Sequence, residues 1–378
     1  ASPYARFTDE EFEKFVPVDF LVEAIDQTRG WANTLLLEHV ILTGKPEAPY
    51  KAFLFYGFAL DAKGRKMSKS LGNVIEANPL LERNSADLCR FYLMWKCSPI
   101  DSMNFDVEEI KRRPYQVLST LYHLHRFFLQ NAEYDGFNPK EHTLEWANKN
   151  NVLKTPEFWL LSKLQGVIEE VTERFERCEF NFAASALEKF VVDNISRDYV
   201  PMIRRELWSD NPETLNRRLA IYVTLWYTLK TVLLLFNPIT PFITEFLYQK
   251  VFRELDNRLP ESINFESWPK PKGNLKNSRL EAEVEVLMKA VSASYSARQA
   301  GRLKRRWPLK RAVVVASKEA KESLEKLKDL FLELANVKEV KLIGESSEKL
   351  RGENWISAVE ENIQVFLDAY RDEKLVGE

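Results

Sequence analysis

The stretch between residues 115 and 255 constrains the fold most, because apolar side chains recur through it at helical spacing. Apolar residues three or four positions apart share one face of a helix, so this pattern predicts long amphipathic helices. Three runs show the spacing: Val117, Leu121, Leu124 and Phe128; Leu160, Leu164, Val167 and Val171; and Leu187, Phe190 and Ile195. Such helices suit a bundle. Pro241 is expected in the first turn of its last helix.

Upstream of the helical region the patterns are mixed. Pro17–Val22 and Ala52–Leu60 are apolar runs that suit strands, and Thr28–Leu42 has helical periodicity. A loop that contains glycine and lysine follows, up to about Val74. Alternating strands and helices of this kind are typical of an α/β domain.

Downstream of the Pro- and Gly-bearing link Trp268–Asn274, the pattern becomes mixed again. We expect a helix from Ser278 to about Gly301, and then, in order, a strand at Ala312–Ala316, a helix at Lys318–Leu334 and a strand at Val337–Ile343. The chain of 378 residues is therefore predicted to be multidomain and mostly α. Its predicted domains are the end of an α/β domain (1–112), a helical bundle (113–270) and a small α/β domain (271–378).

Charge and cysteine content narrow the class of protein. The 54 basic and 56 acidic residues give a net charge of -2, so any surface that binds nucleic acid must be local. Cys89, Cys97 and Cys178 lie far apart, which argues against a disulfide framework and a structural zinc site. A reducing, cytoplasmic setting fits best. No membrane is expected as a partner, because the longest apolar run, around Thr231–Phe236, is too short to span a bilayer.

The start of the chain reads as the interior of a longer one. Ala1 stands where an initiator methionine is usual, and the acidic, aromatic stretch Asp9–Phe15 follows closely. We therefore expect a fragment or a processed piece.

The strongest chemical signal is the run Gly64–Asn73, which reads Gly-Arg-Lys-Met-Ser-Lys-Ser-Leu-Gly-Asn. Its ammonium groups can neutralise charge that grows on a leaving pyrophosphate, and its glycines permit close backbone approach and hinge motion. A solvated basic turn is the competing interpretation. The functional one is favoured because Lys66 to Ser70 match the second signature motif of class I aminoacyl-tRNA synthetases, a family that this chain resembles.

A second match lies upstream, between Glu23 and Trp31 (Glu-Ala-Ile-Asp-Gln-Thr-Arg-Gly-Trp), and resembles the isoleucyl members of that family. The resemblance implies that Glu23 and Asp26 contact the amino acid and the ribose of an adenylate. It also implies that Gln27 touches the adenylate and borders the amino-acid pocket, which Trp31 lines. Independently, strand-to-helix turns of α/β sheets are common ligand sites. The alternative is that Asp26 caps the helix and Trp31 packs in the core.

The resemblance also assigns the residues that handle ATP and Mg²⁺, the expected cofactors. Lys66 and Lys69 would be catalytic, and the predicted ATP- and adenylate-binding residues are Glu23, Asp26, Gln27, Gly57, Phe58, Met67, Ser68 and Ser70. Tyr56 departs from the family, which usually has histidine before this Gly-Phe pair. A phenol can donate a hydrogen bond and stack, but it cannot carry positive charge.

The resemblance continues to about residue 343 and implies the domain types. The first domain would end a Rossmann-type catalytic domain, the second would be an anticodon-binding bundle, and the third would be a small junction domain. The matching segments are Ala86–Tyr92, Ser196–Val200, Arg204–Trp208, Asn237–Glu245, Ser262–Pro269, Ala297–Leu309 and Asn336–Val340.

Two groups of basic residues are predicted to bind tRNA. Seven of the fourteen residues in the segment Arg298–Arg311 are Lys or Arg and none is acidic, and arginines beside an aromatic ring engage phosphates and bases. The predicted residues are Arg197, Arg204 and Arg205 in the bundle, and Arg302, Lys304, Arg305, Arg306 and Trp307 in this segment. The alternatives are ordinary surface charge in the bundle and, for Trp307-Pro308, an anchor of the small domain.

No His-Ile-Gly-His-like motif occurs in the chain, and neither does a P-loop or a G-x-G-x-x-G run. In class I synthetases the first of these supplies the other half of the ATP site. The complete protein is therefore expected to charge tRNA(Ile) with isoleucine, with a missing N-terminal half as partner and this chain alone inactive. Asp26–Trp31 favours isoleucine. A valyl or leucyl enzyme and a non-catalytic tRNA-binding paralogue remain the alternatives.

Overall fold

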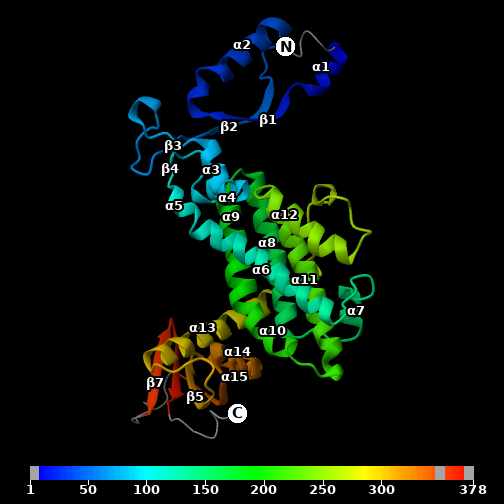
Figure 1. The fold of residues 1–378 in the computed structure, drawn as a ribbon, viewed down its shortest axis with the longest axis vertical. Helices are drawn as coiled ribbons and strands as arrows, with labels where there is room; N and C mark the ends of the chain where they lie inside the picture. The colour runs from blue at the N-terminus through cyan, green and yellow to red at the C-terminus, as the bar shows by residue number, and fades with distance from the viewer. Residues whose placement is uncertain (1–7, 345–353, 370–378) are drawn as a thin grey trace. The chain divides into compact units, whose positions relative to one another are not determined.

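The computed structural model describes residues 8–344 and 354–369 (Figure 1). The chain divides into two compact units. Unit 1 comprises Ala1–Ser119, Glu170–Leu187 and Leu235–Phe246. Unit 2 comprises Thr120–Glu169, Glu188–Leu234 and Leu247–Glu378.

Unit 1 begins with a β-α-β motif. After helix α1 (Asp9–Phe15), strands β1 (Val18–Ala24) and β2 (Tyr50–Tyr56) pair in parallel, with the 3-10 turn η2 (Ile25–Thr28) and helix α2 (Trp31–Thr43) between them. Parallel neighbours need such a crossover, and the two strands and the helix were predicted. Among the described residues this sheet has two strands, so its assignment to a Rossmann-type domain remains a prediction.

The rest of the first 119 residues packs around a small core. Strands β3 (Ala59–Leu60) and β4 (Met103–Asn104) pair in parallel. The connecting helices are η3 (Lys69–Leu71), α3 (Ala77–Arg83) and α4 (Ala86–Lys96), and α5 (Val107–Ile110) follows β4. Cys89, Tyr92, Met103, Phe105 and Ile110 are buried together.

The predicted helical region is confirmed. Every residue of the three periodic runs between Val117 and Ile195 is buried. The helices are α6 (Arg113–Tyr134), α7 (Leu144–Lys149), α8 (Thr155–Glu176), α9 (Phe180–Lys189), α10 (Val200–Leu207), α11 (Leu215–Phe236) and α12 (Pro241–Leu247). The last of these begins at Pro241, as predicted. Wider π-helical turns at η4 (Phe190–Tyr199) and η6 (Tyr248–Arg253) were not predicted.

A buried charge cluster in unit 2 joins three of these helices. The Glu157 side chain on α8 is fully buried, and its carboxylate lies 2.7 Å from the Arg217 guanidinium on α11. Arg217 also pairs with Glu206 on α10 at 2.5 Å, and the Tyr199 hydroxyl donates to Glu157 at 3.1 Å. A buried carboxylate persists only when it is paired and hydrogen-bonded in this way.

Among the described residues, one helical stretch is long and apolar enough to cross a membrane by length and composition. It runs from Pro212 to Phe236, has a mean hydropathy of 1.7, and includes all of α11. However, 78% of the apolar window is buried inside the structure, which is the pattern of a core helix.

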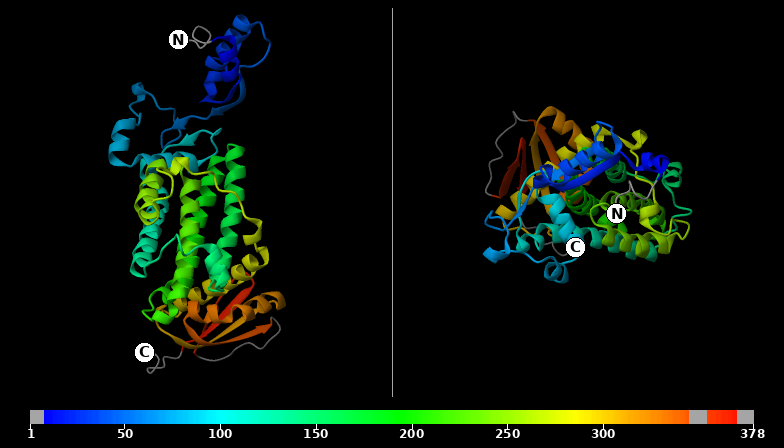
Figure 2. Two further views of the ribbon diagram at one scale, coloured as in Figure 1. Left: turned by 90° about the vertical axis from the view of Figure 1, so that its right-hand side faces the viewer. Right: turned by 90° about the horizontal axis from the view of Figure 1, so that it is seen from above.

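The helix and the two strands predicted at Ser278–Gly301, Ala312–Ala316 and Val337–Ile343 are present in unit 2, and their sheet is larger than predicted. Its strands lie in the order β6-β5-β8-β7, with β5 parallel to β6 and antiparallel to β8. The bounds are β5 (Leu309–Ala316), β6 (Val337–Gly344), β7 (Trp355–Glu360) and β8 (Ile363–Asp368). Helix α13 (Ser278–Ala300) packs on β7 and β8. It lies on the same side of the sheet as α14 (Lys318–Lys326) and α15 (Lys328–Ala335) (Figures 1 and 2).

The single helix predicted at Lys318–Leu334 is wrong. Two helices, α14 (Lys318–Lys326) and α15 (Lys328–Ala335), meet at Leu327, whose backbone is not helical (φ -107, ψ 20). Leu327 is buried, and the bend lets both short helices contact β6.

Candidate functional site

The predicted lysine loop is held at its base by Asp61 and Asn73. The buried Asp61 carboxylate accepts hydrogen bonds from the Arg65 backbone at 2.8 Å and from the Asn73 side chain at 2.9 Å. The Asn73 side chain also accepts from the Ser68 backbone at 2.9 Å and donates to the Lys66 carbonyl at 3.3 Å. The hydrogen bond from Asn73, followed by that from Arg65, holds the pKa of Asp61 well below its usual range. These hydrogen bonds, which we call the clasp, order the base of the loop, while Lys66 and Lys69 remain exposed to solvent.

The structure presents both predicted catalytic lysines at the surface of the loop. The Lys66 ammonium lies 4.8 Å from the centre of the Phe58 ring, within reach of a cation–π contact. Lys69 begins the η3 turn, which the Ser68 hydroxyl caps by accepting from the Leu71 backbone at 3.3 Å. The hydroxyls of Ser68 and Ser70 lie 3.1 Å apart, and Met67 is half-buried. Lysines and serines thus project from a fixed backbone, as a polyphosphate site requires.

Gly57 has a structural reason to be glycine. A Cβ there would lie 2.2 Å from the Asp101 carbonyl oxygen, so a side chain would force two backbone segments apart. Its neighbour Phe58 donates from its backbone to the Ser102 hydroxyl at 3.2 Å. Packing alone accounts for Gly57, and its contact with nucleotide remains a prediction.

In the Glu23–Trp31 segment, Asp26 does not cap the following helix and Trp31 is not buried. The residue that caps α2 is Gly30, so Asp26 is not a helix cap; instead, Asp26 lies exposed in the η2 turn. Trp31 is 43% exposed and meets the Phe53 ring edge-on at 6.1 Å, so it is not buried in this chain, and its place in an amino-acid pocket remains a prediction. Gln27 accepts from the Trp31 backbone at 3.2 Å and thereby fixes the entry to the helix.

Two predicted parts of the adenylate site, the η2 turn and the Tyr56–Phe58 segment, lie at the same end of the sheet. The register places Glu23 beside Phe55 and Ala24 beside Tyr56, so the η2 turn and the Tyr56–Phe58 segment both follow the carboxyl ends of the strands. Ligands commonly bind at this edge of α/β sheets. Among the described residues, no hydrogen bond or ion pair joins the lysine loop to the Glu23–Trp31 segment.

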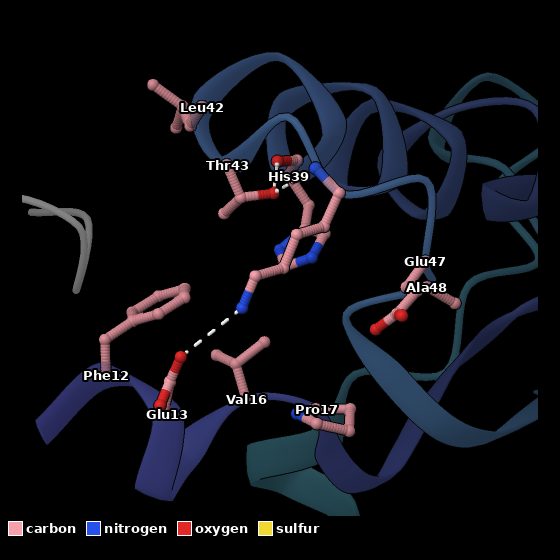
Figure 3. Close-up of a pocket in the computed structure, with 10 residues that line it drawn as sticks. Phe12, Glu13, Val16, Pro17, His39, Leu42, Thr43, Glu47 and Ala48 are labelled. Carbon is pink, nitrogen blue, oxygen red and sulfur yellow. Dashed lines mark hydrogen bonds and ion pairs between the residues drawn. The ribbon is translucent and has the colours of Figure 1, made fainter. Parts of the chain in front are cut away.

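A cavity of about 490 Å³ lies elsewhere in unit 1 (Figure 3). It is lined by α1, by α2 and by the segment that follows α2, and the Lys45 ammonium pairs there with Glu13 at 3.4 Å. The described residues that line it include none of the predicted site residues, so it is not the predicted adenylate site.

Replacing Asn73 by alanine is expected to loosen the lysine loop. The variant loses three hydrogen bonds, one of them to a carboxylate, and each contributes about 0.5–3 kcal/mol. Tryptic cleavage after Lys66 and Lys69 should accelerate by about tenfold or more, because cleavage follows local opening. Ser70→Ala, which removes only an exposed hydroxyl contact, is the control. Equal cleavage of Asn73→Ala and the unmodified chain would contradict the clasp.

The basic segment divides into buried and exposed parts. Arg298 is only 1% exposed and donates to the carbonyls of Lys304, Trp307, Ala335 and Asn336 at 2.9–3.1 Å, so it is structural. The predicted tRNA-binding residues Arg302, Lys304, Arg305 and Arg306 are exposed.

Aromatic rings support two of the exposed cations. The Arg305 guanidinium lies 3.8 Å from the centre of the Tyr295 ring, and the Lys304 ammonium lies 5.5 Å from that of Trp307, which is half-buried.

Arg204 and Arg205 of α10 and Arg306 of the basic segment line one recess in unit 2. Trp208 lines it too and is 69% exposed, but the sequence analysis did not single it out as a site residue. The available signal was its position three residues after Arg205 and directly before the polar run Ser209–Asn211. Arg197 lies apart from these residues and pairs with Asp193 at 2.7 Å.

The described residues contain no group of three or more His, Cys, Asp or Glu side chains that could hold a metal ion.

Two protein-family models match the chain. Residues 2–106 match the family "tRNA synthetases class I (I, L, M and V)". Residues 157–315 match the "Anticodon-binding domain of tRNA ligase". The first match covers the lysine loop and the Glu23–Trp31 segment, and the second covers α10 and the basic segment.

Similar sequences are isoleucine–tRNA ligases. That of Methanopyrus kandleri is 38% identical over 88% of this chain and 30% of its own length. Those of Methanothermobacter thermautotrophicus and Pyrobaculum aerophilum are 35% and 38% identical over 88% of this chain, and 31% and 32% of their own lengths. The chain thus spans about a third of the length of the curated relatives that it matches.

Solved structures share the fold at lower identity. A methionyl-tRNA synthetase from Mycobacterium tuberculosis, bound by methionyl-adenylate, has a TM-score of 0.53 and is 20% identical over 71% of this chain and 52% of its own. A leucyl-tRNA synthetase from Agrobacterium radiobacter K84, in a ternary complex with tRNA and LeuAMS, has a TM-score of 0.51 and is 20% identical over 70% of this chain and 30% of its own. The signature motif, both family models and these relatives agree, and the chain belongs to the class I aminoacyl-tRNA synthetases.

Proposed function

We propose that this chain is part of an ATP-dependent isoleucine–tRNA ligase, in which it supplies the lysine loop and the tRNA-binding helices. The observation that carries the proposal is the Lys66–Ser70 motif, held in an ordered loop by Asp61 and Asn73. Isoleucine is chosen because the matched relatives are isoleucine–tRNA ligases. The proposed domains are a catalytic part at 1–112, an anticodon-binding bundle at 113–270 and a junction domain at 271–378.

The proposed reaction begins with activation of the amino acid. An isoleucine carboxylate oxygen attacks the α-phosphorus of ATP, the bond to the bridging oxygen breaks, and pyrophosphate leaves with its electron pair. Lys66 and Lys69 neutralise the charge that grows on the departing phosphates. Mg²⁺ bound to the ATP phosphates would also neutralise part of that charge, because Mg²⁺ commonly binds to substrate phosphates. The described residues contain no group of His, Cys, Asp or Glu side chains that could hold a metal ion.

The Glu23–Trp31 segment is proposed to hold the amino acid and the ribose. The exposed Asp26 carboxylate can accept ribose hydroxyl bonds, and the exposed Trp31 ring offers an apolar wall. Isoleucine and valine differ by one methylene, which a hydrophobic pocket discriminates by only about 1–3 kcal/mol, a limit known for this very enzyme type. A separate editing step is therefore expected in the whole protein.

The remainder of the ATP site is proposed to lie in a partner segment of the same enzyme. The apolar residues Val18, Phe20 and Val22 along β1 are between 37% and 49% exposed. Parallel sheets are normally covered on both faces, so further structure over β1 would complete the domain. The cytoplasm is the proposed setting, because a reducing compartment suits three free cysteines.

Binding of tRNA by this chain tests the proposal directly. The chain should bind isoleucine tRNA with an affinity that falls steeply with salt, at a log–log slope of about -0.7 to -0.9 per phosphate contacted. Changing Arg302, Lys304, Arg305 and Arg306 together to glutamine should flatten that slope. Changing Lys318 and Lys321 on α14, of which Lys318 is exposed and Lys321 is half-buried, should not.

Filter-binding titrations with isoleucine tRNA and an unrelated tRNA, at several salt concentrations, provide the measurement. Salt-independent binding, or none at low salt, would exclude the basic segment as an RNA surface. Pyrophosphate exchange by the whole protein with isoleucine, valine or leucine distinguishes the valyl and leucyl alternatives. No exchange with any of them would favour a non-catalytic tRNA-binding paralogue. Tyr56, which stands where the family usually has histidine, is consistent with that alternative.

A further inference from the structure

One helix of unit 1, α4, holds the turn that joins two helices of the bundle. Helix α11 ends and α12 begins within residues 236–243, which we call the corner. The corner and α4 both belong to unit 1. Asp87, Arg90 and Phe91 contact the corner, and their spacing of three and four positions places them on one face of α4.

The Asp87 carboxylate caps α12 from outside that helix. Asp87 is 4% exposed and accepts hydrogen bonds from the backbone of Ile243 at 2.6 Å and of Phe242 at 3.4 Å. The N–H groups in the first turn of a helix have no partner within the helix, so they need an acceptor from elsewhere. Burial raises the pKa of Asp87, and the two backbone donors oppose that rise. A buried carboxylate requires such donors, so Asp87 and the start of α12 are held together.

Arg90 binds the carbonyl groups of the same corner. Its guanidinium donates to the Ile239 carbonyl at 2.8 Å and to the Pro238 carbonyl at 3.0 Å. Next to it, the fully buried Phe91 ring stacks on Phe236, the last residue of α11, with ring centres 6.1 Å apart. One face of α4 thus supplies an acceptor, a donor and an apolar contact to the corner, and these contacts fix the two relative to each other.

Other side chains of α4 hold the segment that follows strand β4. The hydroxyl of the fully buried Tyr92 donates to the Glu109 carboxylate at 2.9 Å and accepts from the Asp106 backbone at 3.1 Å. The Lys96 ammonium, one turn further along α4, donates to Glu109 at 2.6 Å. Because Asp106 lies two residues after the end of β4, these bonds tie β4 to α4.

Strand β4 continues the connection to the lysine loop. The Phe105 backbone, directly after β4, donates to the Leu60 carbonyl of β3 at 2.9 Å. Leu60 also forms an antiparallel bridge with Lys66, and the next residue, Asp61, accepts the hydrogen bonds of the clasp. An unbroken series of hydrogen bonds and backbone links, all within unit 1, therefore runs from the corner to the lysine loop.

We propose that Asp87 and Arg90 are positioning residues for amino-acid activation. They fix the corner to α4, and α4 fixes the strand pair from which the lysine loop projects. A group that stabilises growing charge must be in place before the reaction, and a displacement of about 1 Å can cost about 10²-fold in rate. The inference rests on the proposed function, in which Lys66 and Lys69 act on the departing phosphates. It adds that a turn of the helical bundle takes part in a step that involves no tRNA.

Hydrogen exchange in the 378-residue chain tests the connection without any activity. In Asp87→Ala, amide exchange in residues 61–73 should accelerate by about tenfold or more, because exchange reports local opening. Asp87→Asn, which keeps one acceptor oxygen, should retain most of the protection. Arg90→Gln should also accelerate exchange. Because the Arg90 side chain is exposed, that variant decides the question if Asp87→Ala does not fold.

Thr143→Ala is the matched control. Thr143 caps α7 by accepting from the Trp146 backbone at 3.2 Å, and it lies on neither α4 nor the corner. This variant also loses a helix cap, so it shows what a general loss of stability does to residues 61–73. Equal acceleration in Thr143→Ala and Asp87→Ala would overturn the proposal. So would unchanged exchange in both Asp87→Ala and Arg90→Gln.

Pyrophosphate exchange by the whole protein tests the consequence for the reaction. Asp87→Ala should lower kcat by about 10- to 100-fold and change the KM for isoleucine by less than about twofold, because a misplaced loop weakens binding of the transition state alone. Combined with Lys69→Ala, the loss should be smaller than the product of the two single losses, since Asp87 acts through the loop.

A combined loss equal to that product would overturn the assignment of Asp87 as a residue that positions the loop. A rise in KM without a fall in kcat would overturn it too, by showing an effect on substrate binding instead. Absence of exchange in the unmodified whole protein would remove the proposed function, whereas the hydrogen-exchange comparison would still decide whether the corner holds the loop.

Discussion

Lys69→Ala in the whole protein is expected to slow the formation of isoleucyl-adenylate by about 10²–10³-fold. This is the usual loss when one preorganised charge is removed from a developing negative transition state. The Lys69 side chain is exposed at the start of η3 and forms no ion pair among the described residues, so its removal should not disturb the loop. Binding of tRNA should stay nearly unchanged, because this lysine lies outside the predicted tRNA-binding groups.

Pyrophosphate exchange measures this step without tRNA. Lys63→Ala is the matched control, since Lys63 is another exposed lysine shortly before the motif and likewise forms no ion pair among the residues described. An exchange rate in Lys69→Ala equal to that of the control would rule out the catalytic assignment. A loss in both variants would point to general electrostatic attraction of ATP instead.

Arg217→Met is expected to destabilise the bundle by about 3–5 kcal/mol. The substitution leaves the fully buried Glu157 carboxylate with the Tyr199 hydroxyl but without its cation, and an uncompensated buried charge costs this much. The loss should appear in urea unfolding as a lower midpoint. Adding Glu157→Gln should recover a substantial part of the loss, because the buried charge itself is then gone.

Arg197→Met is the control for this prediction. Its partner Asp193 lies one turn away on the exposed surface, and such pairs contribute about 0–1 kcal/mol. A similar small loss in Arg217→Met would mean that water reaches Glu157 in solution, and the buried cluster would not be a stability determinant.

The helical bundle could be predicted from sequence because its apolar spacing is strictly local. The sequence spacing alone places Val117, Leu121 and Phe128 on one buried face, without information on the residues that they contact. The break at Leu327 could not be predicted in the same way, because the helical periodicity of Lys318–Leu334 continues through it. The contacts of two short helices with β6 decide the break.

Strands β7 and β8 were missed although a local signal was present. Ile363, Val365 and Leu367 alternate with less buried neighbours and form the inward face of β8. No strand was predicted beyond residue 343, where the family resemblance ends, so two of the four described strands of this sheet were left unassigned.

The candidate site was predictable where a motif is contiguous and not where it is assembled in space. Lys66–Ser70 was recognisable as a string. The hydrogen bonds that hold this motif in place depend on Asp61 and Asn73, which lie 12 residues apart. No repeating pattern in the sequence predicts that these two side chains meet. The recess depends on residues near 204 and near 306, which only the packing of α10 beside the small domain brings together.

The buried Arg298 guanidinium has a consequence for the order in which the protein is made. It ties the basic segment to Ala335 and Asn336, which follow Arg298 by 37 and 38 residues. During synthesis, the arginines and lysines of that segment leave the ribosome before the carbonyl groups that complete this tie. A nascent or truncated chain that ends before Ala335 therefore has the basic sequence without its final shape, and the proposed RNA-binding surface is expected to form only after the start of β6 has been translated.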